Sequence, residues 1–285
     1  MSYEVSRTSR TAQLGLVRSA VLAWVLVTGS GCLSTQGERD WGGQAGWPVH
    51  GPRVLKAARD ALFDPQTWVP AACALVFAID DWDQEVSDWA TGHTPVFGSQ
   101  DDAVRLSNDL LSVLEAEVPL TVLVTPSGRD PETWVMAKAR GVAVEYGAIA
   151  ATGLATHGLK DWTDRERPNG QDHESLPSGH ASSAFAHATL SNRNLSSIPM
   201  PKGWRRTCQI TNLALAGTVA WARVEGKAHY PSDVLAGAAL GHFLTAFLHD
   251  AFMNLSEGSP VQVALVGLGD GAALQVVLPL PSGRR

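Results

Sequence analysis

Cysteine is scarce in this sequence, and its three cysteines lie far apart. They are Cys32, Cys73 and Cys208 in a chain of 285 residues. None belongs to a Cys-x-x-Cys pair or to a Cys/His group with ligand spacing, which argues against a structural zinc site. So few cysteines also exclude a small domain held together by many disulfides, and their spacing does not determine whether Cys73 and Cys208 pair.

The chain also lacks an excess of positive charge. Lys and Arg total 22 against 28 for Asp and Glu, which gives a formal net charge of −6. Surfaces that bind nucleic acid are rich in basic residues, so this balance argues against nucleic acid as a partner. The hydrophobic content of 45% excludes a disordered chain, and the length allows a large buried core.

Long apolar runs are missing as well. The most apolar segments after the N-terminal region are residues 66–79, 207–222 and 234–249. Each is shorter than the roughly 18 to 20 apolar residues that a membrane-spanning helix needs. This favours a soluble helical bundle tethered near a membrane over an integral protein with several spans.

The first thirty residues have the pattern of an export signal. Three arginines precede an uncharged apolar run over residues 19–27, and small residues then lead to Cys32. This order predicts a signal peptide over residues 1–31 and lipidation of Cys32, although Gly29 stands where lipoprotein signals more commonly have leucine. A secreted protein without a lipid and an uncleaved anchor are the alternatives.

Helical periodicity dominates the remainder of the chain. The Gly- and Pro-rich residues 32–52 predict a flexible tether, and residues 53–255 predict one helical domain. The expected helices cover residues 53–63, 66–79, a segment beginning at Ser99, and residues 133–158, 179–190, 208–223 and 232–253. Residues 256–285 hold two apolar runs around a Gly-Asp-Gly turn, which is typical of a β-hairpin.

The first of three polar clusters runs from Lys160 to Pro168. Lys160 and Arg167 are seven residues apart, so on a continuous helix they would share one face. Pro168 is expected to end that helix and to leave Arg167 at a bend. Two cations on one side suit an oxyanion. The alternative is a solvated charged turn, because acidic residues between them neutralise the cations.

The second cluster is Pro177-Ser178-Gly179-His180, which precedes an Ala-rich segment. Ser178 is a typical N-cap, and the free N–H groups of a helix start attract anions. Gly179 lets a ligand approach the backbone. His180 in the first turn can donate a proton near neutral pH. A capped helix with an incidental histidine is the alternative.

The third cluster contains Arg223, His229 and Asp233. Pro231 fits the first turn of a helix and fixes where it starts. His229 and Asp233 are four residues apart, so the carboxylate can hydrogen-bond one imidazole nitrogen and leave the other free to attack. Arg223 adds a third cation. A surface histidine beside a helix-capping acid is the alternative.

In this order, the three clusters resemble the active-site motifs of the type 2 phosphatidic acid phosphatase superfamily. That superfamily also contains bacterial acid phosphatases and vanadium haloperoxidases. The resemblance implies an all-α helical bundle of this type, and residues 1–60 and the hairpin lie outside it. It assigns phosphate binding to five residues. They are Lys160, Arg167, Ser178, Gly179 and Arg223.

The resemblance also assigns the catalytic roles. His229 is the nucleophile that forms a phosphohistidine, Asp233 orients it, and His180 protonates the leaving group. Ala222 stands where the family usually has serine, which removes a hydroxyl and predicts weakened activity. The segment between Pro168 and Pro177 is shorter than expected, which predicts a tight rim.

The expected function is that of a metal-independent phosphatase acting on a phosphomonoester or diphosphate, with a lipid or isoprenoid phosphate as the substrate class. No metal or other cofactor is expected, because three cations and a helix N-terminus stabilise the transferring group; vanadate is an inhibitor or an alternative cofactor. The expected location is the bacterial cell envelope, as a periplasmic or outer-membrane lipoprotein whose lipid anchor holds it at the membrane surface. A vanadate-dependent haloperoxidase and a non-catalytic anion-binding lipoprotein are the alternatives.

Other polar groups have simpler interpretations. Asp80, Asp81 and Asp83 could suggest calcium, but we expect a solvated helix junction. Histidines recur every seven positions from His173, and its Pro- and Gly-containing loop argues against a metal-binding stripe. Trp162 either walls the pocket or simply packs.

Overall fold

The computed structural model describes residues 41–46, 49, 51–79, 81–127, 131–254, 262–268 and 271–277. The expected signal peptide and Cys32 with its lipidation lie outside the described residues, so both stay predictions. The same holds for the first part of the expected tether.

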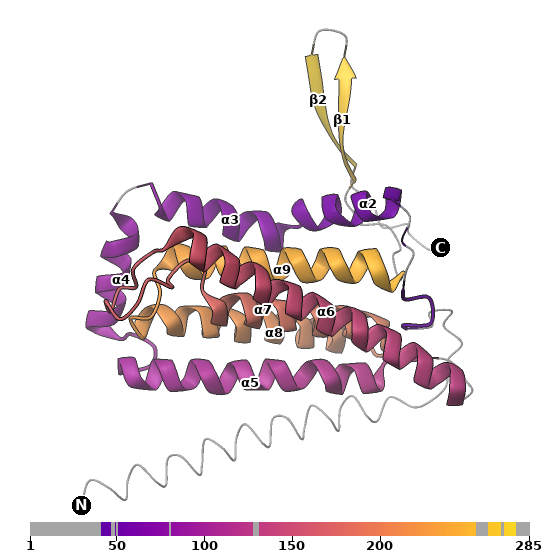
Figure 1. Cartoon of the computed structure of the whole chain (residues 1–285), viewed down its shortest axis with the longest axis horizontal. Coiled ribbons are helices and arrows are strands. Elements are labelled where there is room, and N and C mark those ends of the chain that lie inside the picture. Colours follow the sequence, from indigo (N-terminus) through magenta and orange to yellow (C-terminus); the bar gives the residue numbers. More distant parts are fainter. Residues whose placement is uncertain are drawn as a thin grey trace, which may run out of the picture.

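Eight helices form a bundle in the part of the chain that the structure describes (Figure 1). They are α2 (Gly51–Leu62), α3 (Pro65–Phe77), α4 (Trp82–His93), α5 (Gln100–Val124), α6 (Pro131–Thr163), α7 (Gly179–Ser197), α8 (Lys202–Glu225) and α9 (Pro231–Met253). The expectation of an all-α bundle is confirmed. After it, β1 (Gln262–Leu268) pairs antiparallel with β2 (Gly271–Val277), with Leu265 opposite Leu274.

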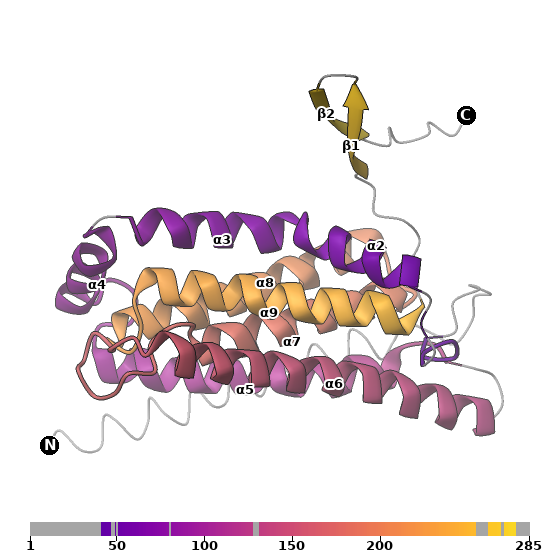
Figure 2. The ribbon, with the colours of Figure 1, turned by 45° about the horizontal axis from the view of Figure 1, so that its top comes forward.

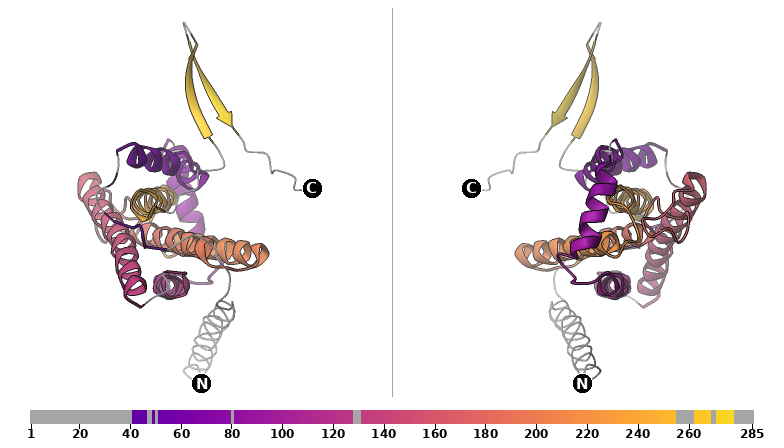
Figure 3. Two further views of the ribbon diagram at one scale, coloured as in Figure 1. Left: turned by 90° about the vertical axis from the view of Figure 1, so that its right-hand side faces the viewer. Right: turned by 90° about the vertical axis from the view of Figure 1, so that its left-hand side faces the viewer.

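Helices α7 and α9 form the centre of the bundle. Helix α9 packs on α2, α3 and α6, and α7 packs on α5, α6 and α8, so other helices surround the pair (Figures 2 and 3). Gly237 and Gly241 of α9 face the first turns of α7. A Cβ at Gly237 would lie 2.6 Å from the Ser178 carbonyl oxygen, and one at Gly241 would overlap the carbonyl of Ser182. The two helices therefore approach each other as closely as their backbones allow.

Capping residues set the helix starts near the site. The Ser99 hydroxyl accepts a hydrogen bond from the Asp102 N–H at 3.1 Å, as the expected start of that helix requires. The Ser178 hydroxyl accepts one from the Ala181 N–H at 3.4 Å. Pro231 occupies the first turn of α9, where its missing N–H costs nothing.

Residues 41–46 pack on the bundle, which corrects the expectation of a flexible tether over this stretch. Trp41 is fully buried, and its indole N–H donates to the Asn194 side-chain oxygen at 2.8 Å. The ring fills the space beside Gly141 of α6, where any Cβ would overlap it. A buried tryptophan and a long-range hydrogen bond outweigh the local freedom of the surrounding glycines. Gly51 and Pro52, which were expected to belong to the tether, instead begin α2.

Among the described helices, α9 is long and apolar enough by length and composition to cross a membrane. The expected apolar run over residues 234–249 lies within this helix. In the structure, 56% of that window is buried inside the bundle. No disulfide joins Cys73 to Cys208.

Candidate active site

The three polar clusters meet at one end of the bundle. Helix α6 ends there, residues 164–178 form the loop into α7, and α8 ends close to the start of α9 (Figure 1). The Ser178 N–H donates to the Asp233 carbonyl oxygen at 3.0 Å, which joins the second cluster to the third. Helix α4 lies against the same end (Figure 1). Residues that are distant in the sequence are thereby brought into one site.

His229 is held in one tautomer by the backbone. It is 2% exposed, and its Nδ1 lies 2.8 Å from the Ser175 carbonyl oxygen. A carbonyl only accepts hydrogen bonds, so Nδ1 carries the proton and Nε2 keeps its lone pair. Asp233 Oδ2 lies 3.8 Å from the same nitrogen. His229 Nδ1 therefore donates to the Ser175 carbonyl and not, as expected from the sequence, to Asp233.

Asp233 is connected to His229 through Ser175. This fully buried carboxylate accepts hydrogen bonds from Arg165 Nη1 at 2.7 Å, from the Ser175 hydroxyl, and from the Tyr230 N–H at 2.8 Å. Burial alone would raise the pKa of Asp233, but the nearby His229, Arg165 and the Ser175 hydroxyl together lower it below its usual value. An ionised Asp233 therefore positions Ser175, which in turn positions His229, and its charge favours a positively charged imidazole.

Arg165 links this carboxylate to helix α4. Its Nη2 lies 2.8 Å from Asp83 Oδ2, and its guanidinium stacks 4.3 Å from the centre of the Tyr230 ring. Asp83 is 6% exposed and also accepts from the Ser232 N–H at 2.8 Å. The expected solvated junction is therefore wrong for Asp83; Asp80 lies outside the described residues. Arg165 is the third basic residue of the first cluster, and only the fold shows that it has buried partners.

Three further cations gather at this end of the bundle. Lys160, in the last turn of α6, is 6% exposed and donates to the Glu174 carbonyl. Arg167 lies in the following loop, as expected, with its Nε 2.6 Å from Asp172 Oδ1. Arg223 is 7% exposed and donates to the Ser107 hydroxyl at 3.2 Å. Its buried Nε has no hydrogen-bond partner among the described residues.

The cations lie close enough to repel one another. Burial, followed by the charge of Arg167, lowers the pKa of Lys160. The same two causes lower the pKa of Arg223 to about 10. Each cation is thus held beside another cation, a situation that a bound oxyanion would relieve.

His180 faces the same group of charges. Burial, followed by the charges of Arg223, His229, Arg167 and Lys160, lowers its pKa to about 4. Its Nε2 lies 2.7 Å from the Asn108 side-chain oxygen on α5, a partner that the sequence analysis did not identify. His180 is therefore neutral at pH 7, and a phosphate among these cations would raise its pKa again.

Gly179 brings the start of α7 against Lys160. A Cβ at this glycine would lie 4.0 Å from Lys160 Cε, an ordinary contact. The N–H groups of the first turn of α7 therefore begin beside the lysine. A helix N-terminus with a capping serine and an adjacent cation is a favourable place for an anion.

A comparison with family models finds a match for the part of the chain that holds these clusters. Residues 143–257 match the PAP2 superfamily. The match confirms the resemblance to the type 2 phosphatidic acid phosphatases, and it contains all three polar clusters. No curated protein matches the chain. Among solved structures, the chain is similar to the first transmembrane PAP2-type phosphatidylglycerolphosphate phosphatase from Bacillus subtilis. The identity is 20% and the TM-score 0.48, over 69% of this chain and 94% of that chain.

The structure places two further residues of the PAP2 segment. Ala222 is fully buried on α8, so the hydroxyl that this position lacks would lie in the protein interior. Trp162 is 81% exposed two residues after Lys160, which excludes simple packing. No cluster of His, Cys, Asp or Glu that could hold a metal is found in the residues that the structure describes.

Proposed function

We propose that this protein is a metal-independent phosphatase whose reaction passes through a phosphohistidine at His229. The observation that carries the proposal is the hydrogen bond from His229 Nδ1 to the Ser175 carbonyl, 2.8 Å long. It leaves Nε2 as an unprotonated nucleophile in a site that collects three cations. The match to the PAP2 superfamily supports the same reaction class.

Phosphate binding is the first step of the proposed reaction. Lys160, Arg167 and Arg223 balance the charge of the phosphoryl oxygens, and the N–H groups that follow Ser178 donate to them. The unpartnered Nε of Arg223 gains an acceptor when a phosphoryl oxygen binds. Because these groups are already positioned by the fold, little reorganisation is needed as charge shifts in the transition state.

Phosphoryl transfer then involves the two histidines. His229 Nε2 attacks phosphorus, the bond to the leaving-group oxygen breaks, and protonated His180 gives its proton to that oxygen. Asp233 stabilises the positive charge that develops on His229. In the second step, neutral His180 takes a proton from water, and the hydroxide attacks phosphorus, which releases phosphate and restores His229.

A lipid or isoprenoid phosphate is the proposed substrate class. Three exposed apolar side chains lie on elements that reach this end of the bundle: Trp162 of α6 is 81% exposed, Ile79 after α3 is 82% exposed, and Trp82 of α4 is 50% exposed. Tryptophan at a boundary between polar and apolar surroundings is typical of membrane interfaces. Exposed apolar side chains at the same end of the bundle as a cationic site suit a substrate that joins a phosphate to a hydrocarbon chain.

The test is hydrolysis of p-nitrophenyl phosphate and of lipid phosphates in vesicles, with a chelator present. The wild-type protein should remain active, and His229→Ala should lose activity by about a thousandfold or more. Stopping the reaction at alkaline pH should trap phosphate on the wild-type protein but not on the variant. The rate on lipid phosphates should exceed that on soluble phosphomonoesters.

His157→Ala is the matched control, because His157 is an exposed histidine of α6. Its activity should equal that of the wild type. Activity in His229→Ala close to the wild-type level would overturn the assignment of the nucleophile. Loss of activity with the chelator would overturn metal independence, and a preference for soluble esters would overturn the lipid substrate alone.

A further inference from the structure

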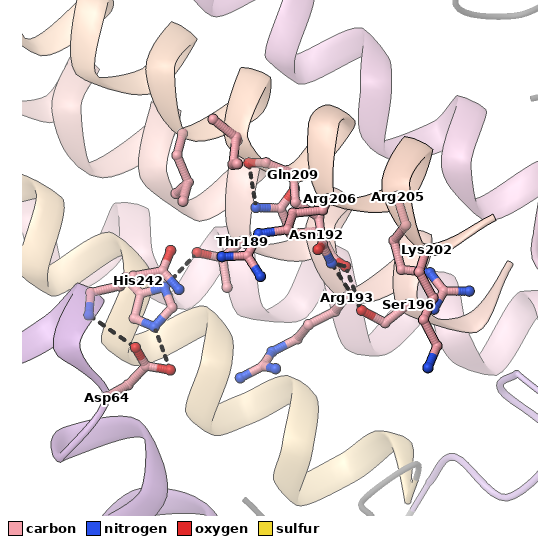
Figure 4. Close-up of a pocket in the computed structure, with 13 residues that line it drawn as sticks. Asp64, Thr189, Asn192, Arg193, Ser196, Lys202, Arg205, Arg206, Gln209 and His242 are labelled. Carbon is pink, nitrogen blue, oxygen red and sulfur yellow. Dashed lines mark hydrogen bonds and ion pairs between the residues drawn. The ribbon is translucent and has the colours of Figure 1, made fainter. Parts of the chain in front are cut away.

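A cavity of about 500 Å³ lies away from the His229 site (Figure 4). It is lined by the start of α3, by α7 and α9, and by the first half of α8. None of the residues assigned to phosphate binding or catalysis lines it. Thr189, which does, follows His180 by nine residues on α7, a distance of about 13 Å along the helix.

The charges around this cavity are mostly positive, although the whole chain has a net charge of −6. Arg193, Lys202, Arg205 and Arg206 line it together with one acid, Asp64. Figure 4 shows their side chains around the same opening. The excess of positive charge is thus local, and its sign is opposite to that of the net charge of the chain.

Two of these cations are held by protein groups. Arg193 pairs with Asp250 at 2.8 Å, and Arg205 donates to the carbonyl oxygens of Leu195 and Ile198 at 3.1 and 3.0 Å. The side chains of Lys202 and Arg206 form no hydrogen bond or ion pair with any residue that the structure describes, and both residues are exposed. They are the cations available to a ligand.

Two buried nitrogen atoms of residues that line the cavity form no hydrogen bond with the described residues, although one of them, His242 Nε2, pairs with Asp64. His242 is 2% exposed; its Nδ1 lies 2.8 Å from the Thr189 hydroxyl, and its Nε2, 3.5 Å from Asp64, forms no hydrogen bond with the described residues. The same is true of the buried Nε of Arg193. Because a buried donor is costly when it has no acceptor, the Nε of Arg193 favours an occupant with acceptor oxygens.

We propose that this cavity is a second anion-binding site, which takes a phosphate group of a soluble ion or of a phospholipid head. Lys202 and Arg206 attract the anion, and the Nε of Arg193 donates to it. The start of α8 adds to this potential, because its N-cap is Pro201 and no side chain caps its first N–H groups. Arginine side chains suit phosphate, because the guanidinium can donate two parallel hydrogen bonds to its oxygens.

The experiment is a calorimetric titration of the full chain with inorganic phosphate. The wild type should show two sites, and Lys202→Gln with Arg206→Gln should show one, because the second weakens by about tenfold or more. The hydrolysis rate and KM of the variant for p-nitrophenyl phosphate should be unchanged, which separates this site from the catalytic one. Arg206→Gln alone should give an intermediate loss, and equal thermal midpoints would show that the variants fold.

The control removes the same charge elsewhere, by Arg105→Gln with Arg140→Gln at exposed positions of α5 and α6. It should keep both sites. A single site in the wild type, or equal titrations of the cavity variant and the control, would overturn the proposal. Sedimentation with phosphatidylglycerol vesicles identifies the ligand. Weaker sedimentation of the cavity variant than of the control supports a lipid head, and equal sedimentation with loss of the phosphate site supports a soluble ion.

Discussion

At the scale of single residues, the site depends on groups that act through others. His229 receives its orientation from a backbone carbonyl at Ser175, and Ser175 is held by Asp233. Asp233 in turn shares Arg165 with Asp83 on α4. Groups in such a chain do not contact the reacting atoms, but they determine how precisely the reacting atoms are placed.

Asp83→Asn tests this chain of contacts. The change removes a charge from a partly buried pair with Arg165 but keeps the shape of the side chain, so Arg165 should shift relative to Asp233. We expect kcat for p-nitrophenyl phosphate to fall about ten- to a hundredfold while KM changes little. Steady-state kinetics measure this.

Asp88→Asn, an exposed aspartate on the same helix, serves as the control and should behave as the wild type. Asp83→Glu should restore part of the rate. If Asp83→Asn changes thermal stability but leaves kcat intact, Asp83 has only a structural role.

The sequence could predict the residues that contact phosphate, because short spacings and helix signals place them. It could not reveal Asp83 or Asn108, since each lies more than 70 positions from its partner. It also assigned Asp233 a direct contact with His229, because spacing within a helix does not show that a backbone carbonyl occupies that place.

At the scale of helices, the pairing of α7 with α9 fixes the distance between the phosphate-binding turn and His229. Most helices were predictable from apolar periodicity. Helix α4 was missed because it is short and largely polar, and α8 begins six residues earlier than expected because its first turns are basic. Which glycines lie at a helix crossing depends on the partner helix, so periodicity alone could not select Gly237 and Gly241.

Gly241→Ala should disturb this crossing. The added methyl group would overlap the backbone of Ser182, which must move. Forced shifts of this kind cost about 1 to 3 kcal/mol of unfolding free energy. Because Ser178 caps α7 and His180 lies in its first turn, kcat/KM should fall as well. Denaturant unfolding and kinetics together measure both effects.

Gly217→Ala on α8 is the matched control, because nothing lies within 4 Å of its added Cβ. Replacing a helical glycine with alanine there should stabilise the protein by roughly 0.5 to 1 kcal/mol. Equal effects of the two substitutions would contradict a close α7–α9 contact.

At the scale of the whole molecule, buried acids and histidines set the pH range of stability. Burial raises the pKa of Glu145 to about 8 and that of Glu117 to about 7. Between their usual values and these, the folded state holds protons that the unfolded state has released, so stability falls as the pH rises. His180 has the opposite effect: its lowered pKa of about 4 means that stability falls as the pH drops from about 6.5. Stability should therefore be greatest at mildly acidic pH.

Glu145→Gln isolates the alkaline side of this balance. Glu145 is fully buried between α6 and its neighbours: its Oε2 accepts from Asn194 at 3.3 Å, and its Oε1 lies 3.9 Å from His249 Nε2 without a hydrogen bond. Burial raises the pKa of Glu145 by more than the hydrogen bond with Asn194 and the charge of Lys138 lower it. Glutamine keeps the acceptor for Asn194, offers an N–H to His249, and cannot ionise. We expect the variant to exceed the wild type in unfolding free energy by roughly 1 to 3 kcal/mol at pH 8, and by less at pH 5.

Urea unfolding at both pH values measures this, with the exposed Glu115→Gln as control. A difference from the wild type that is the same at both pH values would mean that Glu145 is ionised at both. Its pKa would then not be raised by burial.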